Sequence, residues 1–204
     1  MPVADTGEVG RAEATVREYL DQDGIRRLPF ALSDDKEARE RNWMNAAQEV
    51  SKHLQSGKTC AFATIGDPNV YSTFTYLARA VREIEPDVEV ETVPGITALQ
   101  DLASRSRTAL LEGDERLALL PFTAGEEPLR EALAGFETVV CYKGGSRLGE
   151  VLRVAEEGGR LEGAVYGARL GIEGEEVVSA SEMVGREGTY LSTVIFTERG
   201  SELG

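Results

Sequence analysis

Two short loops carry the residues whose types and spacing could form a ligand site. The first, 65–73, reads IGDPNVYST, and the second, 93–98, reads VPGITA. Each follows an apolar run and precedes a helical pattern, and a glycine in such a loop permits a close backbone approach that a side chain would block. Asp67 and Ser72 in the first loop, and the amides beside Thr97 in the second, suit the polar atoms of a nucleoside.

Taken singly, each loop is better explained as a turn, because GDP and PG are common turn sequences. Two such loops after successive apolar runs are less well explained as turns alone. Neighbouring parallel strands bring their carboxyl ends to one edge of a sheet, which is where ligands bind in α/β folds. The sequence therefore predicts that the two loops lie side by side.

The elements that must position these loops follow from the hydrophobic pattern. Apolar runs typical of strands lie at 25–30, 59–65, 88–93, 117–121, 138–142, 164–168 and 190–197. Apolar spacings of three and four predict helices at 13–20, 34–54, 74–84, from 98 onward, 126–134 and 148–157. We expect an α/β fold of two lobes: a mostly parallel sheet in the N-terminal lobe, residues 1–108, and a mixed sheet in the C-terminal lobe, residues 109–204.

Charge and composition exclude several classes of partner. The chain has 22 Lys and Arg against 36 Asp and Glu, a formal net charge of −14. Such a surface repels phosphate backbones and anionic lipids, so we expect no nucleic acid and no membrane as partners. The N-terminal segment lacks the apolar core of a signal peptide, which favours a cytoplasmic protein. We expect Cys60 and Cys141 to be buried, unpaired thiols, and the single histidine allows no zinc cluster.

Motifs along nearly the whole chain resemble one known family. Besides the two loops GDPNVYSTF and VPGIT, the chain contains LPF at 28–30, with Trp43 in the following helix. It also contains GDERLALLP at 113–121, TVVCYKGGSRL at 138–148 and ARLGIEGEEVV at 168–178. In this order they resemble the tetrapyrrole methylase family. The YST after GDP, and the pairing of LPF with the tryptophan, favour its members that methylate precorrin-2 at C(20) during cobalamin synthesis.

The resemblance implies a homodimer that uses S-adenosyl-L-methionine to methylate the C(20) meso carbon of precorrin-2 or of cobalt-factor II. It implies no metal site and no obligatory catalytic base, because the cofactor is already electrophilic and the protein mainly aligns it with a tetrapyrrole. A sister methylase acting on another ring carbon is an alternative. The family also opens with a strand and a GxGPGDP loop that this sequence lacks, so a truncated, non-catalytic chain is a second alternative.

The resemblance also implies which residues contact the cofactor, because they stand at matching positions of the family's motifs. They are Gly66, Asp67, Val70, Ser72, Thr97, Ala98, Tyr142, Lys143, Tyr166, Gly167 and Ala168. Arginine side chains suit the carboxylates of a tetrapyrrole, since the guanidinium fork matches a carboxylate. The candidates for this role are Arg105, Arg107, Arg147 and Arg153.

Overall fold

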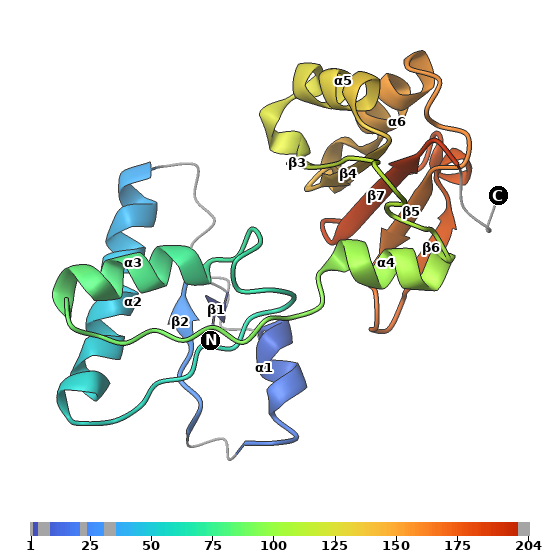
Figure 1. Ribbon diagram of the computed structural model, residues 1–204. Coiled ribbons are helices and arrows are strands. Elements are labelled where there is room, and N and C mark those ends of the chain that lie inside the picture. Colours follow the sequence, from blue (N-terminus) through green and yellow to red (C-terminus); the bar gives the residue numbers. More distant parts are fainter. Residues whose placement is uncertain (1, 4–8, 21–23, 31–35, 200–204) are drawn as a thin grey trace. The chain divides into compact units, whose positions relative to one another are not determined.

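The computed structural model describes residues 2–3, 9–20, 24–30 and 36–199 (Figure 1). The chain divides into two compact units, Met1–Thr97 and Ala98–Gly204, and each is described by itself. Among the described residues, no helix is both long and apolar enough to cross a membrane.

Unit 1 is built on two packed helices. Its elements are β1 (Pro2–Val3), α1 (Arg11–Val16), β2 (Leu28–Pro29), α2 (Lys36–Gln55) and α3 (Phe74–Ile84). Strands β1 and β2 pair in parallel. The buried cluster of this unit joins Leu28 and Phe30 to Ala46 and Ala47 of α2 and to Leu77, Ala80 and Val81 of α3. Helix α3 forms because its apolar residues recur at helical spacing and so cover one face.

The sheet expected in unit 1 is present only as the short β1–β2 pair. The segments 59–65 and 88–93 are not strands in the described part of the chain. A strand is stabilised by hydrogen bonds to a neighbour, and neither segment has a partner in either described sheet. For the same reason Cys60 is exposed, against expectation, whereas Cys141 is buried as expected.

Unit 2 is a mixed five-stranded sheet with helices on both faces. Its helices are α4 (Ala98–Ser106), α5 (Glu126–Gly135) and α6 (Leu148–Glu157), with short 3₁₀ turns at Phe122–Ala124, Gly145–Arg147 and Ala180–Met183. Its strands are β3 (Leu117–Pro121), β4 (Thr138–Tyr142), β5 (Val165–Ala168), β6 (Glu176–Ser179) and β7 (Ser192–Thr197). The strand order is β3-β4-β7-β5-β6. Strands β3 and β4 pair in parallel and the other neighbours are antiparallel, so the mixed sheet is confirmed.

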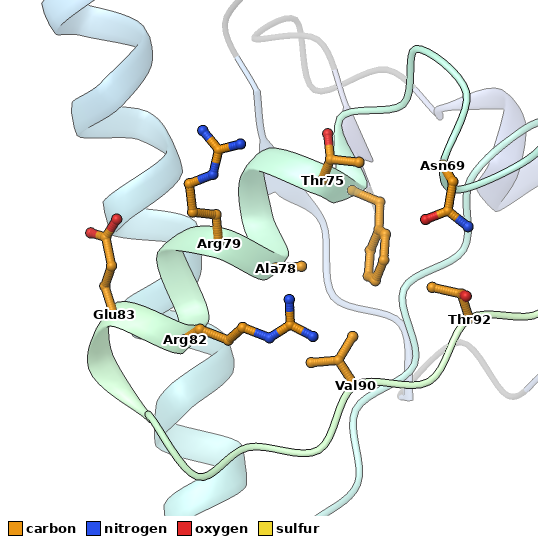
Figure 2. A pocket seen from close by; sticks show the side chains of 9 residues that line it. Asn69, Thr75, Ala78, Arg79, Arg82, Glu83, Val90 and Thr92 are labelled. Atoms are coloured by element: carbon orange, nitrogen blue, oxygen red, sulfur yellow. The ribbon is translucent and has the colours of Figure 1, made fainter.

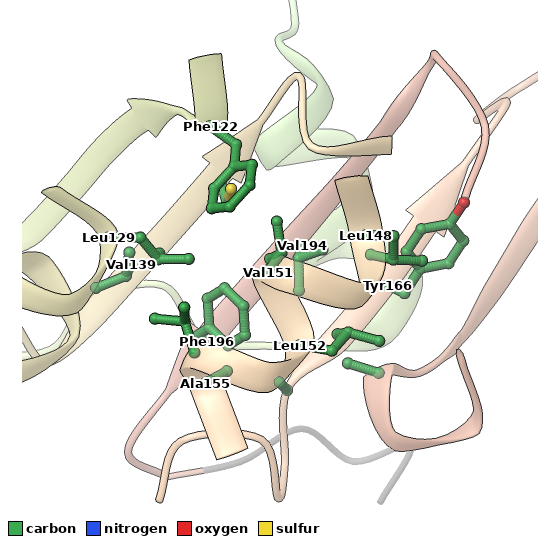
Figure 3. Close-up of a cluster of buried hydrophobic side chains, with 14 of the residues drawn as sticks. Phe122, Leu129, Val139, Leu148, Val151, Leu152, Ala155, Tyr166, Val194 and Phe196 are labelled. Atoms are coloured by element: carbon green, nitrogen blue, oxygen red, sulfur yellow. The ribbon is translucent and has the colours of Figure 1, made fainter. Parts of the chain in front are cut away.

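Alternating side chains divide the core of unit 2 into two clusters. Val139 and Cys141 of β4 point to the face covered by α5 and α6, where Figure 3 shows the larger cluster. Val140, between them, points to the opposite face and packs with Leu102 of α4. This alternation follows from the period of two along a strand. Because α4 contributes to this second cluster, it belongs with unit 2, while the lobe boundary after residue 108 stays a prediction.

Candidate functional site

The two loops singled out in the sequence contact each other directly within unit 1. The Gly95 N–H donates to Asp67 Oδ2 over 3.0 Å. The backbones approach so closely that a Cβ on Gly95 would lie 2.2 Å from the carbonyl oxygen of Gly66. A Cβ on Gly66 would in turn lie 4.0 Å from Thr97 Cα. The juxtaposition predicted from the sequence is therefore present without a surrounding sheet, and Gly95 is required by it.

Asp67 holds the two loops together with both carboxylate oxygens. Its Oδ2 accepts the bond from Gly95, and its Oδ1 accepts the Asn69 N–H over 2.8 Å. These two backbone donors, Gly95 first, hold the pKa of Asp67 below its ordinary value, against a smaller opposing effect of desolvation. The carboxylate is therefore charged at neutral pH and positions backbone, and it is not suited to exchange a proton with a ligand.

The rest of the first loop prepares the start of α3. Gly66 adopts φ +72°, a left-handed conformation open to glycine. The Val70 N–H donates to the Asp67 carbonyl over 3.2 Å and closes the turn. Ser72 is buried; its hydroxyl lies 3.1 Å from the Thr64 hydroxyl and accepts the Phe74 N–H over 3.2 Å. The Ser72 side chain thus binds the first N–H of α3, while Gly66 and Val70 remain half-buried in the loop.

The joined loops present apolar side chains to solvent. Val93, Ile96 and Ile65 are 83%, 74% and 59% exposed. Ile65 ends an apolar run that has no strand partner in the described sheets, and Val93 and Ile96 lie on the second loop. The loops therefore combine backbone polar groups with an apolar rim, which suits an amphipathic small molecule.

In unit 2, three of the expected cofactor residues lie near the start of α4 and the end of β4. The Tyr142 hydroxyl accepts the Leu99 N–H over 2.8 Å and so ties β4 to the first turn of α4. Ala98, at the start of that turn, is exposed. Lys143 follows Tyr142 with φ +58°, in the left-handed region that a lysine rarely adopts. The hydrogen bond between Tyr142 and Leu99 therefore places the turn after β4 beside the start of α4.

The other three expected residues lie on β5, which β7 separates from β4. The Tyr166 side chain is fully buried in the larger cluster, and its hydroxyl accepts the Thr189 N–H over 3.2 Å (Figure 3). A Cβ on Gly167 would lie 2.4 Å from Leu102 Cδ1, so Gly167 makes room for α4. Ala168 is also buried. These residues have a packing role in the structure, and their contact with a cofactor stays a prediction.

The arginines expected to bind substrate carboxylates are mostly occupied by carboxylates of the chain itself. Arg153 lies 2.6 Å from both Glu126 and Glu157. Arg105 binds Asp101 and Glu175 at 2.8 and 2.7 Å, and Arg147 binds Glu150 at 2.5 Å. Each of these three would have to break an ion pair to bind a ligand.

A groove of unit 1 contains two arginines that sequence reasoning missed. It has a volume of about 560 Å³ and lies between α3 and the segment around 90–92 (Figure 2). Arg79 and Arg82 line it. Their spacing of three along a predicted helix placed them on one face, which is the signal that could have identified them. Within the described ranges, no group of three or more His, Cys, Asp or Glu side chains could hold a metal ion.

Comparison with known proteins places this geometry in a family. The family model of the Tetrapyrrole (Corrin/Porphyrin) Methylases matches residues 3–183. A probable cobalt-precorrin-2 C(20)-methyltransferase of Methanocaldococcus jannaschii is 36% identical over 143 residues, 70% of this chain and 59% of the relative. A precorrin-2 C(20)-methyltransferase of a Sinorhizobium species is 33% identical over 150 residues, 74% of this chain and 60% of the relative. The chain thus spans about three fifths of the length of these two curated relatives.

Solved structures share the fold at lower identity. A cobalt precorrin-4 methyltransferase matches with a TM-score of 0.66 at 14% identity, covering 96% of this chain and 82% of that one. A uroporphyrin-III C-methyl transferase from Thermus thermophilus, complexed with S-adenyl homocysteine, matches with a TM-score of 0.55 at 19% identity, covering 85% and 77%. The α/β fold and the motif order agree with the family match over most of the chain. The chain belongs to the tetrapyrrole (corrin/porphyrin) methylase family.

Proposed function

We propose that this protein is an S-adenosyl-L-methionine-dependent methyltransferase that methylates precorrin-2, or its cobalt-bearing counterpart, at the C(20) meso carbon. The observation that carries the proposal is the direct joining of the GDP and PGIT loops through Asp67 and Gly95. The two curated relatives at 36% and 33% identity, both named for C(20) methylation, support the choice of ring position.

The residues present fit a nucleoside cofactor. Gly66, Val70 and Thr97 combine half-buried backbone with the exposed apolar rim of the loops, which suits an adenosine with a hydrocarbon arm. In unit 2, Ala98 and Lys143 are assigned contacts through the helix start and the turn after β4. When bound, S-adenosylmethionine supplies an electrophilic methyl group on its sulfonium.

Asp67, Ser72 and Tyr142 of the expected set also position other groups, because their polar atoms hold the loops, the start of α3 and the start of α4. Tyr166, Gly167 and Ala168 are proposed to contact the cofactor from β5. The protein orients the reactants and excludes water, and orientation alone can contribute about 7–11 kcal/mol to a barrier.

We infer further that the protein works in the cytoplasm as a homodimer on a small-molecule tetrapyrrole, without nucleic acid or membrane partners. The motif resemblance supports the dimer. The net charge of −14 disfavours phosphate backbones and anionic lipids. A second candidate, methylation at another ring carbon, is favoured by the structural likeness to the precorrin-4 and uroporphyrin-III methylases.

Titration calorimetry with S-adenosylhomocysteine tests the proposal. The unaltered chain should bind it. Gly95→Ala should weaken binding more than about tenfold, because the added Cβ would meet the Gly66 carbonyl oxygen at 2.2 Å and force the loops apart. Gly149→Ala is the matched control, because a Cβ there meets nothing within 4 Å. Absence of binding by the unaltered chain would favour a non-catalytic protein, and unchanged binding by folded Gly95→Ala would refute the assignment of the loops.

A further inference from the structure

The groove of unit 1 begins at the cofactor loop and runs along α3. Asn69, whose N–H is held by Asp67, lies at one end with Thr92, and Glu83 lies at the other (Figure 2). Between them the lining is apolar at Phe74 and Ala78, both on α3. A molecule seated in the groove would therefore reach from the turn that Asp67 stabilises to the last turn of α3.

Arg79 and Arg82 are the cations of this groove, and they differ from Arg105, Arg147 and Arg153, which bind carboxylates of the chain. Arg82 extends from α3 towards Val90, and Arg79 projects from the preceding part of the same helix (Figure 2). Among the residues that the structure describes, no carboxylate forms an ion pair with either, although Glu83 lines the groove as well. Both guanidinium groups are therefore available to an anionic ligand, one on each of two successive turns of α3.

The lining defines the chemistry of the occupant. An apolar wall requires a hydrocarbon surface, and Asn69, Thr75 and Thr92 offer hydrogen bonds at its margin. Two guanidinium groups at a spacing of three residues favour an anion with planar, paired oxygen acceptors, which a carboxylate provides. A flat hydrocarbon body with carboxylate arms meets all three requirements.

We propose that this groove binds carboxylate side chains of the tetrapyrrole substrate through Arg79 and Arg82, with Phe74 against the adjoining hydrocarbon. The proposal rests on the proposed function, since it assigns a subsite for the same substrate. It also explains how a strongly acidic protein accepts a polycarboxylate: the two arginines provide a local positive site that the net charge conceals.

The test uses fluorescence titration of the full chain with uroporphyrin III, a stable polycarboxylate, and a parallel titration with S-adenosylhomocysteine. Arg82→Gln should weaken uroporphyrin binding about fivefold and the Arg79→Gln/Arg82→Gln double variant about twentyfold, as expected for partly exposed ion pairs. Neither should change affinity for S-adenosylhomocysteine by more than about twofold. Lys58→Gln, which removes one exposed positive charge elsewhere in unit 1, is the control and should leave both affinities unchanged.

The outcomes separate the two proposals. The subsite is supported if the arginine variants lose affinity for uroporphyrin and still bind S-adenosylhomocysteine as the unaltered chain does. Equal uroporphyrin binding by the unaltered chain and the double variant overturns the subsite and leaves the proposed function standing. Binding of S-adenosylhomocysteine without any binding of uroporphyrin also overturns the subsite. Failure of the unaltered chain to bind either molecule overturns the proposed function, and the subsite with it.

Discussion

Gly167→Ala should destabilise unit 2 through one contact, and a second substitution should relieve it. A Cβ on Gly167 would lie 2.4 Å from Leu102 Cδ1 and 3.0 Å from Cδ2. Leu102 is 0% exposed, so it cannot turn away into solvent. Overpacking of this kind costs about 1–3 kcal/mol. Alanine also lowers the conformational entropy of the unfolded chain, which offsets about 0.4–1 kcal/mol of this cost. We therefore expect the free energy of unfolding to fall by about 1–2 kcal/mol.

The partner substitution gives the matched test. Leu102→Ala alone leaves a cavity and should cost about 2–5 kcal/mol. In the double variant the new methyl group enters that cavity, so the combined loss should fall short of the sum by about 1 kcal/mol or more. Hydrogen exchange of the amides of β5 and β7 measures this directly, because the single tryptophan, Trp43, lies in unit 1 and does not report on unit 2.

Additive losses in this cycle would refute the packing explanation for Gly167. Direct contact between Gly167 and the cofactor, the role expected from the motif, gives a separate readout. It predicts that Gly167→Ala weakens binding of S-adenosylhomocysteine and that Leu102→Ala does not restore it. The packing explanation predicts that the stability losses fall short of additivity and that the affinity of the folded Gly167→Ala variant for S-adenosylhomocysteine does not change.

Three further perturbations test other parts of the account. Asp67→Ala should accelerate hydrogen exchange of the two backbone amides that the carboxylate binds, while leaving exchange in unit 2 unchanged; unchanged protection would contradict its role as a clamp. Arg116 lowers the pKa of Glu137 to about 2 from its ordinary 4.5, so this pair stabilises the fold above pH 4.5 and loses its effect as the pH falls towards 2. Glu137→Gln should therefore flatten acid unfolding in that range, as followed by circular dichroism. Burial raises the pKa of Cys141 to about 12, so iodoacetamide should label Cys60 alone in the native protein and both thiols after denaturation.

Helix α3 and most elements of unit 2 could be predicted closely from the sequence, whereas strand β6 (Glu176–Ser179) was not predicted. Strands 117–121 and 138–142 and helices 74–84 and 148–157 have the predicted limits. In these segments the local pattern and the tertiary contacts agree: Val151, Leu152 and Ala155, for example, all face the larger cluster. Where the local pattern and the tertiary contacts agree in this way, the pattern alone is enough to predict the limits of an element.

The strands of unit 1 could not be predicted in the same way. The run TCAFATI at 59–65 has the composition of a buried strand, but a strand depends on hydrogen bonds to a neighbour distant in the sequence. No local pattern reports whether that neighbour is in place. Exposure of Cys60 and of Ile65 is the direct consequence.

The contact between the loops could be predicted, but the way in which Asp67 makes it could not. The order of the two loops in the chain and the repeated strand–loop–helix pattern predicted that the loops lie side by side. The use of both carboxylate oxygens on backbone donors depends on the left-handed conformation of Gly66 and the close approach of Gly95. Similarly, the ion pair of Arg153 with Glu126 joins residues 27 positions apart, so residue type alone did not distinguish Arg153 from Arg79 and Arg82, which form no ion pair with a described carboxylate.

Transfer of a carbon-13 methyl group would show whether the protein methylates the C(20) carbon. The full chain is incubated with precorrin-2 and S-adenosylmethionine labelled on the methyl carbon, and the product is analysed by carbon NMR. We expect one labelled methyl group, bonded to the C(20) meso carbon, and the formation of S-adenosylhomocysteine in equal amount. A label on another ring carbon would show a sister methylase, and no transfer by a folded chain would contradict the proposed activity.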